Sequence, residues 1–286
     1  MLFDDYKGFV FYDGAMGTML QKRGLRQGER PDIMNITAPG DVCEVHELYV
    51  KAGSDVIVTN TFGANAKALS GCGYSVDSVI TGAVESAKHA CRGTNAKVAL
   101  DVGPLGYLLE PLGDIKYETA YDLFMEQVVA GERAGADLIA IETMSDIREL
   151  EAAILAAIEN TELPVLATMT FDKTGHTFTG CTPELFAKTA SRLGAAAIGL
   201  NCSLAPEEMY ATAERIAKST DLPLIVKPNA GLPDPETGSY SIDAREFARQ
   251  MKPFAKIGAK IVGGCCGTTP EYIAELKTVF TELRAH

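Results

Sequence analysis

The chain alternates short apolar segments with helical segments along its length, and this alternation restricts the fold more than any other feature. Most of the apolar segments are followed closely by Gly, Asn, Asp or Cys. Strands that alternate with helices predict a parallel sheet. We predict eight strands, at Phe9–Tyr12, Asp55–Thr59, Lys97–Val102, Asp137–Ile141, Val165–Thr170, Ala195–Leu200, Pro223–Lys227 and Ala259–Gly263.

Helical patterns lie between most of these strands, and three of them open with proline, which suits the first turn of a helix. Eight strand–helix units fit a (β/α)8 TIM barrel, a single α/β domain over residues 1–286. An open doubly wound sheet is the alternative, although it rarely uses eight equal units. We predict irregular segments at Leu25–Asp41 and Asp234–Ser241. The predicted helices are Thr119–Ala134, Asp146–Asn160, Pro183–Leu193, Pro206–Ser219, Ile242–Ile257 and Pro270–Leu283.

Composition excludes several partners. The formal net charge is 26 − 38 = −12, which argues against binding to nucleic acid or to an anionic membrane surface. No apolar run approaches the ~20 residues that span a bilayer. The N-terminus lacks the basic and then apolar pattern of a signal peptide. The chain has seven cysteines, an odd number without an export signal, so we expect a cytoplasmic protein with free or metal-bound thiols.

Three cysteines stand where strands end. Cys265 and Cys266 are adjacent and lie between Gly263-Gly264 and Gly267, while Cys202 follows another apolar strand. Neighbouring strand residues point to opposite faces, so two adjacent thiolates share one metal only where the strand stops and the backbone bends. We attribute that bend to the glycines. Three convergent thiolates predict a zinc site with one open position, which is typical of catalysis. Buried structural cysteines are the alternative, whereas a redox pair is disfavoured because adjacent cysteines close a strained ring.

Other polar residues at the strand ends suit an amino acid. Asp13 and Glu142 each end a strand, and together they would suit an ammonium group. The glycine-rich turn that begins at Gly14, Ala15 and Met16 could hold a carboxylate through its backbone N–H groups. Each residue also has an ordinary structural role open to it, as a helix cap or an ion-pair partner. Asn229 is equally consistent with turn chemistry and with a neutral oxygen ligand at the fourth zinc position.

These stretches together resemble the homocysteine S-methyltransferase family, and most of all the homocysteine-binding barrel of cobalamin-dependent methionine synthase. The resemblance covers almost the whole chain, and the Asn-Cys and Gly-Gly-Cys-Cys-Gly motifs are its most specific part. The matching stretches are Asp13–Thr18, Thr59–Asn65, Glu142-Thr143, Gly199–Ser203, Pro228–Gly231 and Gly263–Thr269.

The resemblance implies a role for each of these residues. Cys202, Cys265 and Cys266 would bind Zn²⁺, Asp13 and Glu142 would hold the amino group of homocysteine, and Asn229 would be the ligand that the substrate displaces. Zn²⁺ with three thiolates has a charge of about −1, and a fourth thiolate makes it about −2. Such a centre is a poor Lewis acid but leaves sulfur nucleophilic, so the zinc would activate the homocysteine thiolate.

The resemblance leaves the methyl donor open. Methionine synthases continue into folate- and cobalamin-binding regions, whereas this sequence stops at His286. We therefore expect methylcobalamin on a separate corrinoid protein as the donor, with S-methylmethionine as the alternative. Two other classes are less favoured. An aldolase- or isomerase-like barrel has only Lys227 as a candidate strand-end lysine, and a non-catalytic zinc-binding barrel leaves the open ligand position unused.

Overall fold

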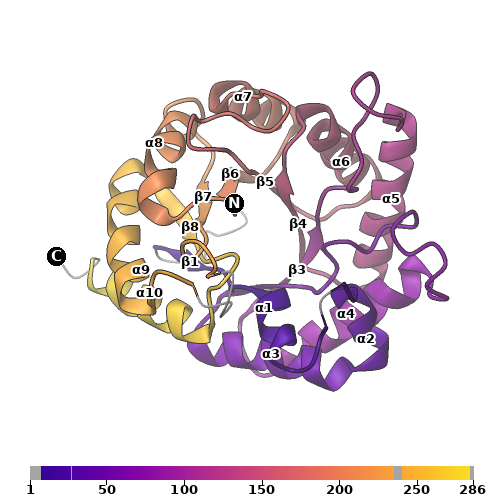
Figure 1. Ribbon diagram of the computed structural model, residues 1–286, viewed down its shortest axis with the longest axis horizontal. Helices are drawn as coiled ribbons and strands as arrows, with labels where there is room; N and C mark the ends of the chain where they lie inside the picture. The colour runs from indigo at the N-terminus through magenta and orange to yellow at the C-terminus, as the bar shows by residue number, and fades with distance from the viewer. Residues whose placement is uncertain (1–7, 27, 235–239, 284–286) are drawn as a thin grey trace.

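A computed structural model describes residues 8–26, 28–234 and 240–283, and its eight parallel strands form a ring (Figure 1). Around the ring the strands pair in the order β1-β8-β7-β6-β5-β4-β3-β2. The ring closes between β1 and β2, where Tyr12 pairs with Val56 and the Asp55 N–H donates to the Phe11 carbonyl oxygen at 2.6 Å. The predicted TIM barrel is thereby confirmed. The strands are β1 (Val10–Phe11), β2 (Val56–Val58), β3 (Lys97–Val102), β4 (Leu138–Met144), β5 (Val165–Met169), β6 (Ala197–Asn201), β7 (Leu224–Lys227) and β8 (Ala259–Val262).

Helices surround the ring (Figure 1), and all six predicted helices are confirmed with small shifts at their ends. One of them, Ile242–Ile257, is divided into α9 and the 3₁₀ helix η2. Pro253 lies in η2 and has no N–H to continue the α-helical hydrogen bonding. These helices are α5 (Tyr117–Ala134), α6 (Ile147–Asn160), α7 (Pro183–Leu193), α8 (Pro206–Ala217), α9 (Ala244–Met251) with η2 (Lys252–Ile257), and α10 (Pro270–Glu282). Among the described residues, none of the helices combines the length and apolar character that crossing a bilayer requires.

The prediction of an irregular segment at Leu25–Asp41 is wrong, because much of it is helical. The chain there forms η1 (Pro31–Ile33) and α2 (Met34–Thr37), and α3 (Pro39–Ala52) begins within it. The sequence prediction did not name these helices among its examples, nor α1 (Met16–Gln21) and α4 (Val76–Ala90). α4 is rich in β-branched residues, which weaken a helical pattern in sequence. Most of the second predicted irregular segment, Asp234–Ser241, lies outside the described residues.

The barrel interior holds its own apolar cluster, separate from the larger core between strands and helices. Side chains two apart on a strand point to the same face. The side chains two positions after the inward apolar residues therefore also point inward, and they lie nearer the carboxyl ends of the strands. Residues two beyond Ala99, Ala140 and Ile225 are Asp101, Glu142 and Lys227, so the upper layer of the interior is polar. The inward apolar residues are Val10, Tyr12, Val56, Val58, Ala99, Leu138, Ala140, Leu166, Ala197, Ile225 and Ile261.

Candidate active site

A cavity of about 470 Å³ opens at the carboxyl ends of the strands. This is the end of the barrel at which TIM-barrel enzymes place their reactive groups. The cavity wall contains every residue that the sequence singled out for the site except Asn229. It also contains charged residues that were given no role at a substrate site, among them Asp101 and Lys227. Its lining includes Asp13, Gly14, Ala15, Met16, Asp101, Glu142, Cys202, Lys227, Cys265 and Cys266.

The three strand-end cysteines come together, as the sequence predicts. The sulfur atoms of Cys202, Cys265 and Cys266 all lie within 4.8 Å of one another. The Sγ atoms of Cys202 and Cys266 are 3.8 Å apart. All three side chains are half-buried at the cavity wall. The cluster is therefore accessible from the cavity.

Backbone geometry directs these thiols toward one another. Cys202 and the next residue, Ser203, have φ angles of 62° and 61°, in the left-handed region that ordinary residues rarely adopt. On the other strand end, Gly267 has a φ of 82°, as the predicted bend requires. Gly264 is needed for a different reason, which is lack of space. A Cβ atom there would lie 2.2 Å from the Thr268 Oγ1 atom.

The sulfur cluster is suited to a cation. Hydrogen bonds from Cys265 and Cys266 lower the pKa of Cys202 to about 3. The hydrogen bond with Cys202 in turn raises the pKa of Cys265 well above its usual value and that of Cys266 to about 11. Without a metal ion, these hydrogen bonds favour a negative charge on Cys202 that the other two thiols stabilise. A metal ion would favour loss of the remaining protons.

The donor set fits zinc. A tetrahedral zinc ion with bonds of about 2.3 Å to sulfur separates its sulfur ligands by about 3.8 Å. The Cys202–Cys266 separation of 3.8 Å equals this value. Three protein ligands that face a cavity leave the fourth coordination position of a tetrahedral ion open to a further ligand. The residues present could therefore hold a metal ion of the catalytic type.

Asn229 contacts the sulfur cluster, although it does not line the cavity. Its Oδ1 atom accepts a hydrogen bond from the Cys266 N–H at 3.1 Å, and its side chain also hydrogen-bonds to Cys202. The Cys265 backbone is held on the same loop, since its N–H donates to the Pro228 carbonyl oxygen at 2.8 Å. Asn229 thus contacts two of the three cysteines and helps fix the positions of their sulfur atoms.

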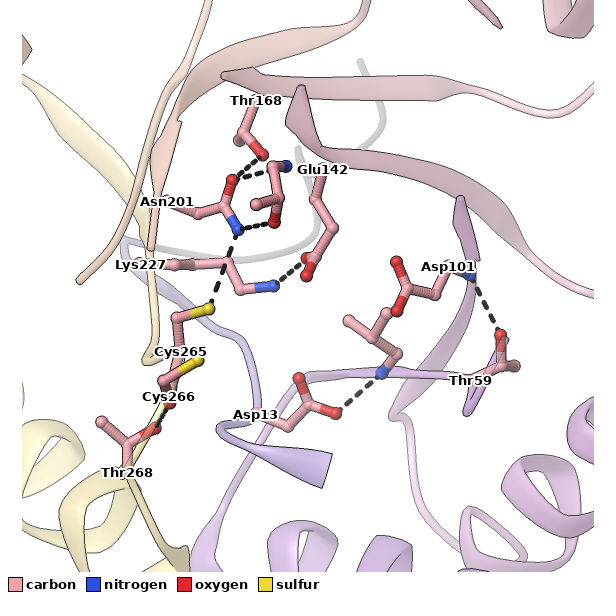
Figure 2. Close-up of polar contacts among 12 residues, drawn as sticks. Asp13, Thr59, Asp101, Glu142, Thr168, Asn201, Lys227, Cys265, Cys266 and Thr268 are labelled. Atoms are coloured by element: carbon pink, nitrogen blue, oxygen red, sulfur yellow. Dashed lines mark hydrogen bonds and ion pairs between the residues drawn. The ribbon is translucent and has the colours of Figure 1, made fainter. Parts of the chain in front are cut away.

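Glu142 has a protein partner that sequence reasoning did not identify. The Lys227 Nζ atom lies 2.5 Å from the Glu142 Oε2 atom, and the two side chains are only 5% and 13% exposed (Figure 2). Burial lowers the pKa of Lys227, but the charges of Glu142 and Asp13 outweigh it and raise the pKa above the usual range. A lysine held as ammonium is a poor nucleophile. The aldolase-like reading of Lys227 therefore has no support from the geometry.

Asp13 lies across the cavity from this pair. Its Oδ2 atom accepts a hydrogen bond from the Val58 N–H at 2.8 Å. Burial raises the pKa of Asp13 to about 7, against the lowering effect of Lys227. The chain then turns into α1, and the Ala15 N–H donates to the Thr268 carbonyl oxygen at 3.1 Å. This bond fixes the turn but uses the Ala15 donor.

Asn201 belongs to the Asn-Cys motif, but the sequence analysis gave it no role of its own. Its Oδ1 atom accepts from the Thr143 N–H at 2.8 Å and from the Thr168 hydroxyl at 2.7 Å (Figure 2). Its Nδ2 atom donates to the Thr143 hydroxyl at 2.7 Å and faces the Cys265 sulfur at 3.8 Å. Thr143 has a φ of 61° at an irregularity in β4, next to Glu142. Asn201 thus connects the carboxylate side of the cavity to the sulfur cluster.

The remaining cysteines lie away from these strand ends, as expected for structural residues. Cys91 and Cys181 are buried, and Cys72 precedes α4. Cys43 lies near Glu47 and His89 on α3 and α4, with their ligand atoms within 4.8 Å of one another. Glu47 and His89 are exposed. That group is on the outer helices, so the sulfur cluster at the cavity is the candidate catalytic metal site.

Comparison with known proteins identifies the family of this chain. Residues 10–280 match the family model described as Homocysteine S-methyltransferase. The chain is 33% identical over 289 residues to methionine synthase of Mycobacterium leprae (strain TN), which covers 92% of this chain and 24% of that protein. It is 31% identical over 296 residues to methionine synthase of Mycobacterium tuberculosis (strain ATCC 25618 / H37Rv), with 95% and 24% covered. The chain therefore spans about a quarter of the length of these relatives.

Solved structures of a homocysteine methyltransferase are also similar to this chain. The metallated form of the homocysteine methyltransferase MmuM from Escherichia coli superposes with a TM-score of 0.85 at 26% identity, covering 97% of this chain and 99% of that one. Its apo form gives a TM-score of 0.79 at 27% identity, covering 98% and 100%. Fold, motifs and the matched residues together lead to one conclusion: the chain belongs to the homocysteine S-methyltransferase family.

Proposed function

We propose that this protein transfers a methyl group to the sulfur of homocysteine and forms methionine at the cavity. The observation that carries the proposal is the convergence of Cys202, Cys265 and Cys266 at the wall of a cavity whose other side is acidic. Homocysteine has a thiol at one end, which suits the sulfur cluster, and an ammonium group at the other, which suits the acidic side of the cavity. Membership of the family and the similarity to MmuM support the same substrate.

The acidic side of the cavity would bind the amino group. Asp13 and Glu142 are our candidates for its partners, and Lys227 keeps Glu142 in place through the contact at 2.5 Å. The substrate carboxylate would lie toward Gly14, Ala15 and Met16, where the backbone N–H groups of the first turn of α1 begin. This orientation would direct the thiol to the sulfur cluster.

The cysteines would hold Zn²⁺, which when bound keeps the substrate sulfur deprotonated at neutral pH, where a free thiol is only a few per cent thiolate. Asn229 is our candidate for a fourth ligand that the substrate displaces. Its Oδ1 atom accepts one hydrogen bond, from Cys266, and a carbonyl oxygen has a second lone pair. The protein residues thus bind and orient the nucleophile, while the methyl group comes from elsewhere.

For the donor, we infer methylcobalamin on a separate corrinoid protein. Large apolar side chains are exposed on the loops that follow four of the strands and surround the cavity, such as Phe62 at 41%, Tyr107 at 47%, Phe178 at 82% and Leu232 at 69%. An exposed apolar surface of this kind is suited to docking of a partner. The 33% identity to a methionine synthase four times longer than the matched region supports a donor carried outside this barrel.

S-methylmethionine or another small donor is the second candidate. The observation that favours it is the cavity itself, which is open at the carboxyl ends of the strands. A small donor would enter the open cavity and need no docking surface. The same acceptor chemistry serves both candidates.

The test is methionine formation by zinc-loaded protein from homocysteine, with methylcobalamin and S-methylmethionine supplied in parallel. Product from methylcobalamin alone supports a corrinoid partner, and product from S-methylmethionine supports the second candidate. Cys265→Ala should abolish both reactions, whereas Cys72→Ser, a substitution away from the cavity, should abolish neither. Binding of zinc and homocysteine without product from either donor would retain the acceptor site and overturn both donor assignments.

A further inference from the structure

Asp101 is a buried carboxylate that the proposed function does not yet use. It lies in β3, is 8% exposed and lines the cavity. Figure 2 shows its side chain pointing toward the space between Asp13 and Glu142. Its Oδ1 atom has no hydrogen-bond partner within the described residues. A buried acceptor left without a partner is costly, so such an atom at a cavity wall indicates a place for a ligand.

The backbone of Asp101 is held on both sides. Its N–H donates to the Thr59 hydroxyl at 3.0 Å, and its carbonyl oxygen accepts from the Thr61 hydroxyl at 2.7 Å. The two hydroxyl groups also bond to each other at 2.7 Å. Thr59 and Thr61 thus hold the backbone of Asp101, whose Oδ1 atom has no hydrogen-bond partner among the described residues. A fixed position with a free acceptor is expected of a binding residue.

The charges around Asp101 favour a cation. When ionised, Asp13, Asp101 and Glu142 place three negative charges near the single positive charge of Lys227. Burial, and after it the charge of Glu142, raises the pKa of Asp101 well above its usual value. Lys227 opposes this, while Asp13 and Asp32 add to it. An arriving ammonium group would lower this pKa again and release the proton.

We propose that Asp101 is a third carboxylate that binds the substrate ammonium group and restricts the acceptor to thiols with an α-amino group. The inference rests on the proposed function. Asp13 already accepts a hydrogen bond from Val58, and Glu142 is already paired with Lys227. Of these three carboxylates, Asp101 is the one whose buried acceptor has no hydrogen-bond partner in the part of the chain that the structure describes. It therefore contributes most to discrimination between an amino acid and its deamino analogue.

The test compares two thiols on the zinc-loaded chain by titration calorimetry: homocysteine, and 4-mercaptobutanoate, which lacks only the amino group. Asp101→Asn and Asp101→Ser should each weaken homocysteine binding by about 10- to 100-fold and leave 4-mercaptobutanoate within about twofold. Titration in two buffers of different ionisation enthalpy should also show fewer protons released on homocysteine binding to the variants. Asp32→Asn is the matched control, because Asp32 lines the same cavity but already accepts from the Gly63 N–H at 3.0 Å.

Each outcome decides the proposal. Loss of homocysteine affinity in both Asp101 variants, with the analogue and the Asp32→Asn control little changed, supports it. Equal weakening of both thiols would assign Asp101 a structural role and overturn the proposal, and so would unchanged homocysteine binding. If the unsubstituted protein binds neither thiol, the proposed function itself is overturned, and the inference falls with it.

Discussion

The ammonium of Lys227 contacts the carboxylate of Glu142 at 2.5 Å at the base of the acidic cavity wall. The pair joins β7 to β4 across the barrel interior, and the Lys227 Nζ atom also lies 4.9 Å from the centre of the Tyr12 ring. Two charges removed from water are stable only when paired. The contact therefore maintains the barrel interior and also fixes one of the residues assigned to the substrate.

Lys227→Met should destabilise the protein by roughly 3–5 kcal/mol, because it leaves Glu142 buried without its counter-charge. The double variant Lys227→Met/Glu142→Gln removes both charges and should recover part of this loss. Urea denaturation of both single variants and the double variant measures the coupling between the two residues. A double variant whose loss equals the sum of the two single losses would contradict the account.

Alanine at Cys202, Cys265 or Cys266 should each lower bound zinc below one ion per chain, because a site with two remaining thiolates holds the ion weakly. Metal analysis after dialysis against a weak chelator gives the stoichiometry. Cys72→Ser should retain the metal, since Cys72 lies outside the cluster. Full zinc occupancy in Cys265→Ala would place the metal at another site.

Asn229→Ala should reduce zinc affinity by about 10- to 100-fold, as expected for loss of a residue that supports metal ligands. The variant loses the hydrogen bond that holds the Cys266 N–H at 3.1 Å. Competition with a chelator of known affinity measures the change. Asn229→Asp keeps an acceptor at this position, so it should retain more affinity than alanine. Equal affinity for all three proteins would remove Asn229 from the account.

Glu149 should make stability depend on pH. Burial raises its pKa from 4.5 to about 7, against the hydrogen bond from the Leu105 N–H. Between these two values the folded chain retains a proton that the unfolded chain has lost, so stability decreases as pH rises from about 4.5 to about 7. Glu149→Gln should remove this decrease and be more stable at pH 8 by roughly 2–3 kcal/mol.

Urea denaturation at pH 5 and pH 8 checks this prediction for Glu149→Gln. The control is Glu126→Gln, a substitution of an exposed glutamate on α5. It should leave the pH dependence unchanged. Asp13 contributes a decrease over the same range, because its pKa is also raised to about 7. A decrease in Glu149→Gln as large as that in the unsubstituted protein would contradict the assignment to Glu149.

The sequence was sufficient to predict the barrel, the rim that carries the site and the three cysteines. These features depend on local patterns: apolar strands, glycine turns and thiols at strand ends. Lys227 and Asp101 were not assigned to the substrate site, although strand alternation could have found them. Each is a charged residue two positions beyond an inward apolar residue, Ile225 and Ala99.

Other features depend on contacts between distant segments, which no local pattern contains. The hydrogen bonds of Asn201 join three strands, and Glu142 is paired with Lys227, which is 85 residues away in the sequence. The segment Leu25–Asp41 was misjudged because its helices are short and depend on tertiary packing more than on periodicity. Glycine at position 264 is required by Thr268, a clash that becomes evident only in three dimensions.

The most direct test of the central claim is the number of sulfur ligands on zinc, counted by X-ray absorption spectroscopy with and without homocysteine. We expect three sulfur ligands and one lighter ligand in the zinc-loaded protein. Homocysteine should change this to four sulfur ligands, since its thiolate completes the set made by Cys202, Cys265 and Cys266. A count that stays at three at saturating homocysteine would contradict the assignment of this cluster as the site that activates the acceptor thiol.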